Sequence, residues 1–400
     1  MKRMQIGVIL VLLLVAIFAC DNNKTKITSM KDLKVNEMFT FQTVKPVKLI
    51  LNSVTEQGDP LPGADFTIMR SDSKKVLKAR TNSSGSFEFT ITVPSYERKI
   101  TLVSGEDSVE LNLPSDGELI HTFTGTTTKA KATYSYFTPA ERIFGSLCFE
   151  DFWPSNGDYD LNDLVLDFNV EEVYDEDTWE LTNLIFKYKV RAIGARKTIG
   201  FGITLPDYIY ASDDPISTNN MASWDAAHNT LVFFNSARDV VSDDPANFFN
   251  TDYALPHNSD SEIVHEINLP AAEDWGKSSR MVWIPWYSAP FNPFIYIDND
   301  ISHQIHLKHY PIIPGYMNMA LFNQVDDNSD VTYPDYPQSF QNLNFQPWAF
   351  YIAESIQYPR EQTSILRVFP DFADWALSDG WDYQDWYQNP NLNYIYDPNH

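Results

Sequence analysis

Residues 155–168 read SNGDYDLNDLVLDF and place an acidic loop directly before a strand-like run. Three Asp and one Asn occur within Asp158–Asp163, and Leu164, Leu166 and Phe168 then share one face of an alternating pattern. A period of two residues is typical of a β-strand. The stretch therefore predicts a strand that begins immediately after a turn rich in oxygen ligands.

Similar strand-like runs continue on both sides of this loop. They are short and are separated by Pro, Gly, Asn and Asp, a pattern that favours strands over helices. With 400 residues, of which 43% are hydrophobic and 14% aromatic, the chain can form two domains with substantial interiors. We predict an all-β protein: a small N-terminal β-sandwich, then a larger β-sandwich-type domain with a short C-terminal helix.

The domain boundaries follow changes in composition. Residues 21–38 are polar and predict a tether, residues 39–124 predict the small sandwich, and residues 125–131 (GTTTKAK) predict a linker. The larger domain is predicted over residues 134–396. Its expected strands are LVLDFNV, NLIFKYKVRAI, TIGFGITL, TLVFFN, EIVHEINL, MVWIPWY, FIYI and QIHL. Near its end, FPDFADWALSDG predicts a helix closed at Gly380, with Phe372, Trp375 and Ala376 on one face.

The first 20 residues predict a signal peptide. A basic start (MKRMQ) is followed by an apolar run (IGVILVLLLVAIFA) and then by Cys20. The segment IFAC resembles the lipobox of bacterial lipoproteins, in which the cysteine is lipidated and becomes the mature N-terminus. We therefore expect a lipid anchor at Cys20 in the outer membrane, with the body exposed at the cell surface; a periplasmic orientation is the alternative. The apolar run is short for a spanning helix.

The formal charge of −25 limits the expected partners. It becomes −27 without residues 1–20, which carry Lys2, Arg3 and no acid. Such a surface repels the phosphates of nucleic acids and attracts divalent cations. We expect the membrane as a partner through the lipid, together with a surface glycan or protein. Cys148, the remaining cysteine, is expected to be a buried small hydrophobe without a disulfide.

The acidic loop predicts a calcium site. Calcium binds about six to eight oxygen atoms at flexible angles, and a D-x-D-x-N spacing allows one loop to direct alternate side chains at one ion. The segment is not an EF-hand, because Asp163 stands where that motif needs Gly and Asn169 where it needs Glu. The candidate ligands are Asp158, Asp160, Asn162 and Asp163, with Glu150 and Asp151 as the nearest further acids.

An Asx-rich turn without any ion is the alternative. Asp and Asn side chains readily bond their own backbone two residues further on. However, no Lys or Arg lies between Glu150 and Asp167, so the repulsion among the carboxylates is not relieved locally. This imbalance favours a cation. Zinc would need His or Cys ligands, which the loop lacks.

Two parts of the chain resemble known families. EQGDPLPGADFTIM and TNSSGSFEFTI, within residues 47–113, resemble carboxypeptidase-regulatory and prealbumin-like sandwiches, which are commonly spacers or adhesion units. The segments FEDFWPSNGDYDLNDLVLDF, FNPFIYI, QIHL, LNFQPWAFYI, IQYPRE and FPDFADWALSDG resemble the LruC domain of bacterial cell-surface lipoproteins, in order over residues 134–387. Gln304 stands where that family usually shows Glu. The resemblance implies a calcium-binding loop and an envelope location, and it carries no enzymatic activity.

The sequence contains no motif for catalysis. G-x-S-x-G, H-E-x-x-H and a phosphate loop are missing, and the glycines of residues 200–202 lack the pattern of a dinucleotide loop. His303 and His306 fall on opposite faces of a strand, which argues against zinc there. We expect the aromatic groups around Trp283 and Trp381 to fill or seal a core.

These observations predict a binding or adhesion protein that is not an enzyme. A carbohydrate-active hydrolase is the alternative, because it would need only two carboxylates at a suitable separation. A purely structural envelope component is a third possibility.

Overall fold

Strands dominate the computed structural model, which confirms the predicted all-β class. The structure describes residues 27–114, 117–127, 133–175, 180–206, 223–241, 248–255, 261–269, 289, 291–332 and 338–397. The signal peptide, Cys20 and the expected strand MVWIPWY (residues 281–287) lie outside these ranges.

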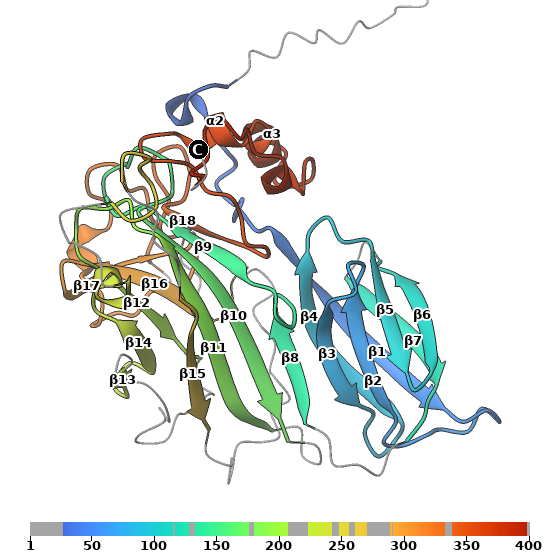
Figure 1. Cartoon of the computed structure of the whole chain (residues 1–400). Coiled ribbons are helices and arrows are strands. Elements are labelled where there is room, and N and C mark those ends of the chain that lie inside the picture. The colour runs from blue at the N-terminus through green and yellow to red at the C-terminus, as the bar shows by residue number, and fades with distance from the viewer. Residues whose placement is uncertain are drawn as a thin grey trace, which may run out of the picture.

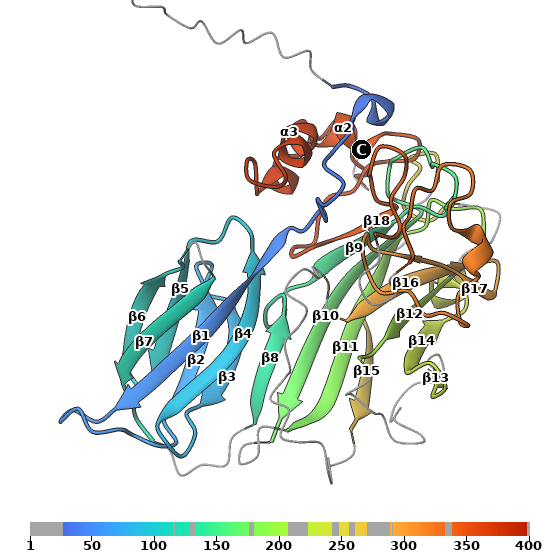
Figure 2. The same ribbon diagram turned by 180° about the vertical axis from the view of Figure 1, so that it is seen from behind.

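The described strands form three sheets (Figures 1 and 2). A three-stranded sheet has the order β4 (Ser86–Pro94), β1 (Val44–Val54) and β7 (Glu118–Thr124). A five-stranded sheet has the order β13 (Ser223–Asp225), β14 (Thr230–Phe234), β12 (Ile199–Thr204), β16 (Asn292–Ile297) and β17 (Asp300–His306). A ten-stranded sheet runs β15 (Ile263–Asn268), β11 (Leu181–Ala192), β10 (Leu164–Tyr174), β8 (Tyr134–Thr138), β3 (Lys75–Arg80), β2 (Asp65–Arg70), β5 (Lys99–Ser104) and β6 (Asp107–Asn112), with β9 (Gly145–Phe149) between β10 and β18 (Ala349–Ile352).

The described helices are short. The α-helices are α1 (Ala237–Val241), α2 (Ile365–Val368) and α3 (Phe372–Leu377), and single 3₁₀ turns lie at η1 (Met30–Asp32), η2 (Met319–Leu321) and η3 (Trp386–Gln388). None of the helices in the described ranges has the length and apolar character needed to cross a membrane.

Strand β8 joins the two predicted domains within one sheet. It pairs with β3, which belongs to the N-terminal part, and with β10, which belongs to the C-terminal part. The predicted boundary between residues 124 and 134 therefore falls inside a continuous sheet.

The sheets enclose two main hydrophobic interiors. One combines side chains of the three-stranded sheet with those of β2, β3, β5 and β8, and includes Leu49, Phe66 and Tyr136. The other combines β9, β10 and β11 with the five-stranded sheet and includes Leu166 and Phe201. Burial of these alternating apolar positions supplies the main driving force for the fold.

A third cluster brings the N-terminal segment onto the C-terminal helices (Figure 1). The Phe39 and Trp375 rings lie 5.1 Å apart, and the Phe41 and Phe372 rings 6.1 Å apart. Met30 is buried in the same cluster. Residues 27–38, the described part of the predicted tether, are therefore packed against the body and do not form a free linker, because their apolar side chains find a partner surface beside α3.

The C-terminal helix and Cys148 are as predicted. In α3, Phe372, Trp375 and Ala376 are buried together, and Gly380 adopts φ +80° just beyond the helix, in the left-handed region that glycine accepts without strain. Cys148 is 1% exposed, and burial raises the pKa of its thiol.

Candidate metal centre

The acidic loop connects two neighbouring antiparallel strands. Strand β9 ends at Phe149, β10 begins at Leu164, and these two residues are paired across the ladder. The loop of residues 150–163 therefore starts and ends at the same place, which brings Glu150 at its start close to the acids at its end. Sequence spacing left open which of two adjacent acids would face the loop, and the structure assigns that position to Glu150.

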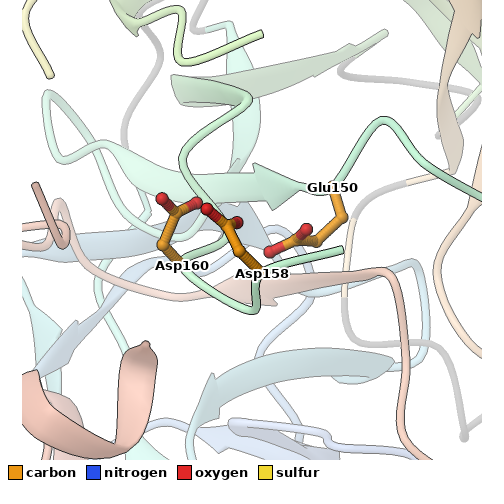
Figure 3. Close-up of side chains that lie close together, drawn as sticks. All are labelled: Glu150, Asp158 and Asp160. Carbon is orange, nitrogen blue, oxygen red and sulfur yellow. The ribbon is translucent and has the colours of Figure 1, made fainter. Parts of the chain in front are cut away.

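Three carboxylates converge at this site (Figure 3). Glu150, Asp158 and Asp160 each offer one oxygen, and these oxygens all lie within 4.8 Å of one another. Oxygens that share one calcium ion at the usual bond length of about 2.4 Å can be up to about 5 Å apart. The spacing therefore suits a single ion. Asp158 is exposed, whereas the other two residues are buried, so the site opens to solvent on the Asp158 side.

The backbone of the loop fixes these side chains. Tyr159 and Leu161 adopt φ +63° and +55°, a left-handed conformation that is unfavourable for residues with side chains. Hydrogen bonds compensate for it: the Leu161 amide donates to Glu150 Oε1 at 2.8 Å, and the Gln362 amide donates to Asp160 Oδ2 at 2.8 Å. The loop is thus held in a curled form that points alternate acids inward.

Within the described residues, three buried oxygens at the site have no hydrogen-bond partner: Glu150 Oε2, Asn162 Oδ1 and Glu361 Oε2. The Glu150 and Asn162 side chains are 1% and 0% exposed. A buried acceptor without a donor is costly, about 1–3 kcal/mol and more for a charged group. A Cβ atom at Gly157 would stand 1.6 Å from Glu150 Oε2, so a side chain there would displace the Glu150 carboxylate from this position. These oxygens are available to a cation.

Glu361 joins the site from a distant part of the chain. Its Oε2 and Asn162 Oδ1 both lie within 3.0 Å of the point where a Cβ atom at Gly194 would stand. Burial, followed by the charge of Asp158, raises the pKa of Glu361 to about 7. Sequence spacing could not reveal this residue, because it lies two hundred positions from the loop. The signal available was its position as the last residue of IQYPRE, one of the segments that resemble the LruC family.

Two predicted ligands have other partners. Asp163 Oδ2 accepts a hydrogen bond from the Asp151 amide at 2.7 Å, and this bond closes the base of the loop. The Asp151 carboxylate lies 3.6 Å from the Lys197 ammonium. Asp151 is therefore paired with a basic residue, and neither acid belongs to the converging group of three.

The acids resist ionisation as long as no cation is near. Burial, followed by the charges of neighbouring acids, raises the pKa of Glu150 and Asp160 well above the usual range, and burial followed by Asp151 does the same for Asp163. Burial also raises the pKa of Asp158. In the described part of the chain, no ion pair joins Glu150, Asp158 or Asp160 to a basic side chain. A divalent cation would supply the missing positive charge.

The histidine strand has a structural role. The His306 ring nitrogens face Asn292 Oδ1 at 2.7 Å and Gln304 Oε1 at 2.9 Å, and burial lowers the pKa of His306 to about 3. His303 bonds the Trp153 carbonyl at 2.9 Å. The two histidines thus have different hydrogen-bond partners.

The described C-terminal aromatic residues divide into two groups. Trp386 and Tyr387 are buried beside α3, as predicted for core residues, whereas Trp381 is 81% exposed and Tyr383 is also exposed. The prediction was wrong for this second pair, because both lie on the turn that leaves α3 after Gly380. Trp283 lies outside the described residues.

A protein-family comparison places the chain. The sequence model described as "Domain of unknown function (DUF4842)" matches residues 180–387, just over half of the chain. The chain belongs to this family. The matched range includes Glu361 and ends before the C-terminus, and the acidic loop precedes it. Among curated proteins, none matches the chain.

Solved structures give a fold relative. A crystal structure from Bacteroides ovatus, described as a "Putative lipoprotein", has a TM-score of 0.55 at 16% identity, with 88% of this chain and 98% of that chain covered. At this identity the similarity shows a shared fold. BcpA, the major pilin subunit of Bacillus cereus, reaches a TM-score of 0.17 at 11% identity over 66% of this chain and 67% of its own, too low to support any conclusion.

Proposed function

We propose that this protein is a lipid-anchored component of the bacterial outer membrane, exposed at the surface, whose acidic loop binds calcium. Its role is binding or adhesion, with a surface glycan or protein as the partner, and not catalysis. The Ala19-Cys20 lipobox and the fold shared with the Bacteroides ovatus protein support the anchor. The resemblance to the LruC domain supports the envelope location.

One observation carries the calcium proposal: Glu150 Oε2 is buried without a partner beside Asp158 and Asp160. The proposed first ligands are these three carboxylates, and Asn162 Oδ1 and Glu361 are next in reach. The set consists of oxygen atoms, which suits calcium and not zinc. Bound calcium would hold the loop of β9–β10 against the segment that contains Glu361, and so would stabilise the fold.

The way in which the acids are held supports the proposed non-catalytic role. Glu150 and Asp160 each accept a hydrogen bond from a backbone amide of a curled loop, and both are buried. A glycosidase instead needs a pair of acids that flank a bound sugar. Fixed, inward-pointing acids suit a structural cation better.

Thermal denaturation tests the calcium proposal. Adding millimolar calcium to chelator-treated protein should raise its melting temperature. Magnesium should raise it less, because it prefers a strict octahedron and retains its waters. Asp158→Ala should abolish the rise, whereas Glu56→Gln, an exposed acid in the N-terminal part, should preserve it. Identical melting of metal-free protein with and without calcium would refute the proposal.

A glycan array tests the role. Binding to defined glycans without release of sugar supports a binding protein, whereas release of sugar would establish the hydrolase alternative. Binding to no glycan would direct the search to protein partners or to a purely structural role. Palmitate labelling that persists in Cys20→Ala would contradict the anchor.

A further inference from the structure

Five strongly exposed apolar side chains surround the N-terminal segment of residues 31–39. We call them the exposed apolar group: Met38, Val325, Leu343, Leu377 and Trp381. Trp381 is 81% and Val325 73% exposed. Soluble proteins seldom gather large apolar side chains in this way without a partner.

One side of the group is tied to this segment by the loop of residues 325–344. The Val35 amide donates to the Asn344 carbonyl at 3.2 Å, and the Asn344 side chain donates to the Lys31 carbonyl at 3.0 Å. The Leu343 amide in turn donates to the Asp326 carbonyl at 3.2 Å. Leu343 therefore lies next to the contact with residues 31–35, and Val325 precedes Asp326, the backbone partner of Leu343.

The other side is tied to it by the turn after α3. The Asn36 side chain donates to Asp379 Oδ2 at 3.0 Å. Phe39 lies 3.1 Å from the point where a Cβ atom at Gly380 would stand. Leu377 and Trp381 flank this contact in sequence, and Met38 is part of the segment itself. All five residues belong to the N-terminal segment or to the two segments that are hydrogen-bonded to it. Figures 1 and 2 show the N-terminal segment beside α2 and α3 at one end of the molecule.

The same end is the one nearest to the predicted lipid. Cys20 precedes Ile27, the first described residue, by seven positions, and a chain of that length spans at most about 25 Å. A lipid at Cys20 would therefore keep this end, and not the distal strands, close to the bilayer. The orientation argument rests on the lipid anchor of the proposed function.

We propose that the exposed apolar group docks into the interface of a lipid bilayer with uncharged headgroups. Trp has an apolar ring and a polar N–H, a combination that favours the boundary between headgroups and acyl chains. Asp379 and Asp382 lie next to Trp381, and together with Asp32 and Glu37 they outnumber the exposed Lys31 and Lys34 of the N-terminal segment, so anionic headgroups would be repelled. The docked protein would present this end to the membrane and its remaining surfaces to the surroundings.

Vesicle flotation tests the proposal with an unlipidated chain of residues 20–400, which contains every residue that the structure describes. The probe is phosphatidylcholine vesicles, and calcium is present throughout. The chain should float with the vesicles, and replacing one quarter of the lipid with phosphatidylglycerol should reduce binding at low salt. Trp381→Ser and Leu343→Ser should each weaken the partition coefficient roughly tenfold. Ile120→Ser, an exposed apolar residue on β7, is the matched control and should bind as the original chain does.

Several results would overturn the proposal. The unlipidated chain could fail to float, or Trp381→Ser could float as well as the control at an unchanged melting temperature. A dimer seen by light scattering that Trp381→Ser dissolves, without vesicle binding, would instead assign the group to a second copy. Palmitate labelling at Cys20 is scored separately. If Cys20 is labelled but the unlipidated chain does not bind vesicles, the anchor stands and the docking surface is refuted. If Cys20 is not labelled but the unlipidated chain binds vesicles, the anchor alone is refuted.

Discussion

Buried acids within β10 and in the loop before it differ in whether a basic side chain lies beside them. Asp167, within the strand, is 5% exposed, lies 2.9 Å from Arg191 and accepts a hydrogen bond from Ser355. Asp160 and Glu150, at the loop before the strand, are 1% exposed, and no ion pair reaches them within the described ranges. At Asp167 the chain supplies its own positive charge. At the loop it supplies none within the described ranges, and the proposed calcium ion would fill that role.

Removing Arg191, the basic partner of Asp167, should have the largest effect on stability. Arg191→Met leaves Asp167 buried and uncompensated, which should lower the free energy of unfolding by about 3 kcal/mol, with or without calcium. The second substitution Asp167→Asn should restore part of this loss, because it removes the unpaired charge. Chemical denaturation of the single and double variants measures both effects. If the loss of stability in Arg191→Met depended on calcium, the distinction between Asp167 and the loop acids would be wrong.

Removing calcium from the proposed site at the acidic loop should have the next largest effect on stability. An ion that binds the folded state alone adds about 2.7 kcal/mol at about 100 times its dissociation constant. For a chain of this size, that corresponds to a fall of roughly 3–4 °C in melting temperature on chelation. Calorimetry of the same sample before and after chelation measures it. A shift that also occurs in Asp158→Ala would place the ion elsewhere.

Glu361 should contribute a smaller share. Glu361→Gln removes one negative charge from the site and leaves the loop intact, so calcium affinity should fall about tenfold, or about 1.4 kcal/mol. Isothermal titration compares this variant with Glu56→Gln, whose affinity should not change. Equal affinities in the two variants would remove Glu361 from the ligand set.

The smallest expected effect is the share of Glu361 in the pH dependence of the calcium-free protein. Burial raises the pKa of Glu361 from 4.5 to about 7, so this acid binds a proton in the folded state where the unfolded chain does not. Its contribution to stability is complete below pH 4.5 and is lost as the pH rises through about 7. The gap in unfolding free energy with and without calcium should therefore widen by about 1 kcal/mol from pH 5 to pH 8. A gap that narrows would contradict a carboxylate site.

The strands were largely predictable because their pattern is local. Alternation at Leu164, Leu166 and Phe168 indicated β10, and the same reasoning found α3 with its Gly380 end. Strands β8 and β9 escaped prediction, since all their residues are buried on both faces and show no alternation. The pairing of β8 with β3 is a contact between distant segments, which composition does not encode.

The site was predictable as far as its loop extends. Asp158, Asp160 and Glu150 were identified from spacing and charge, and the structure brings them together. Asp151 pairs with Lys197, which lies on the connection between β11 and β12. Glu361 belongs to the C-terminal segment, which packs against the loop. Tertiary packing decides these contacts, so the loop sequence alone included two acids that the structure pairs elsewhere, Asp151 and Asp163, and did not include Glu361.

The packing of residues 27–41 against α3 also defines how the molecule would carry mechanical load. Tension from an anchor at Cys20 would enter at Ile27, and the contacts of residues 30–41 with the body, which end in the rings of Phe39 and Phe41 against the α3 aromatics, would bear it first. Beyond them the chain continues into β1, which is flanked by β4 on one side and β7 on the other. Pulling β1 along its own axis would shear both backbone ladders at once, the geometry in which hydrogen bonds share force. A flow-exposed surface protein attached in this way would yield at its aromatic contacts well before its sandwich opened.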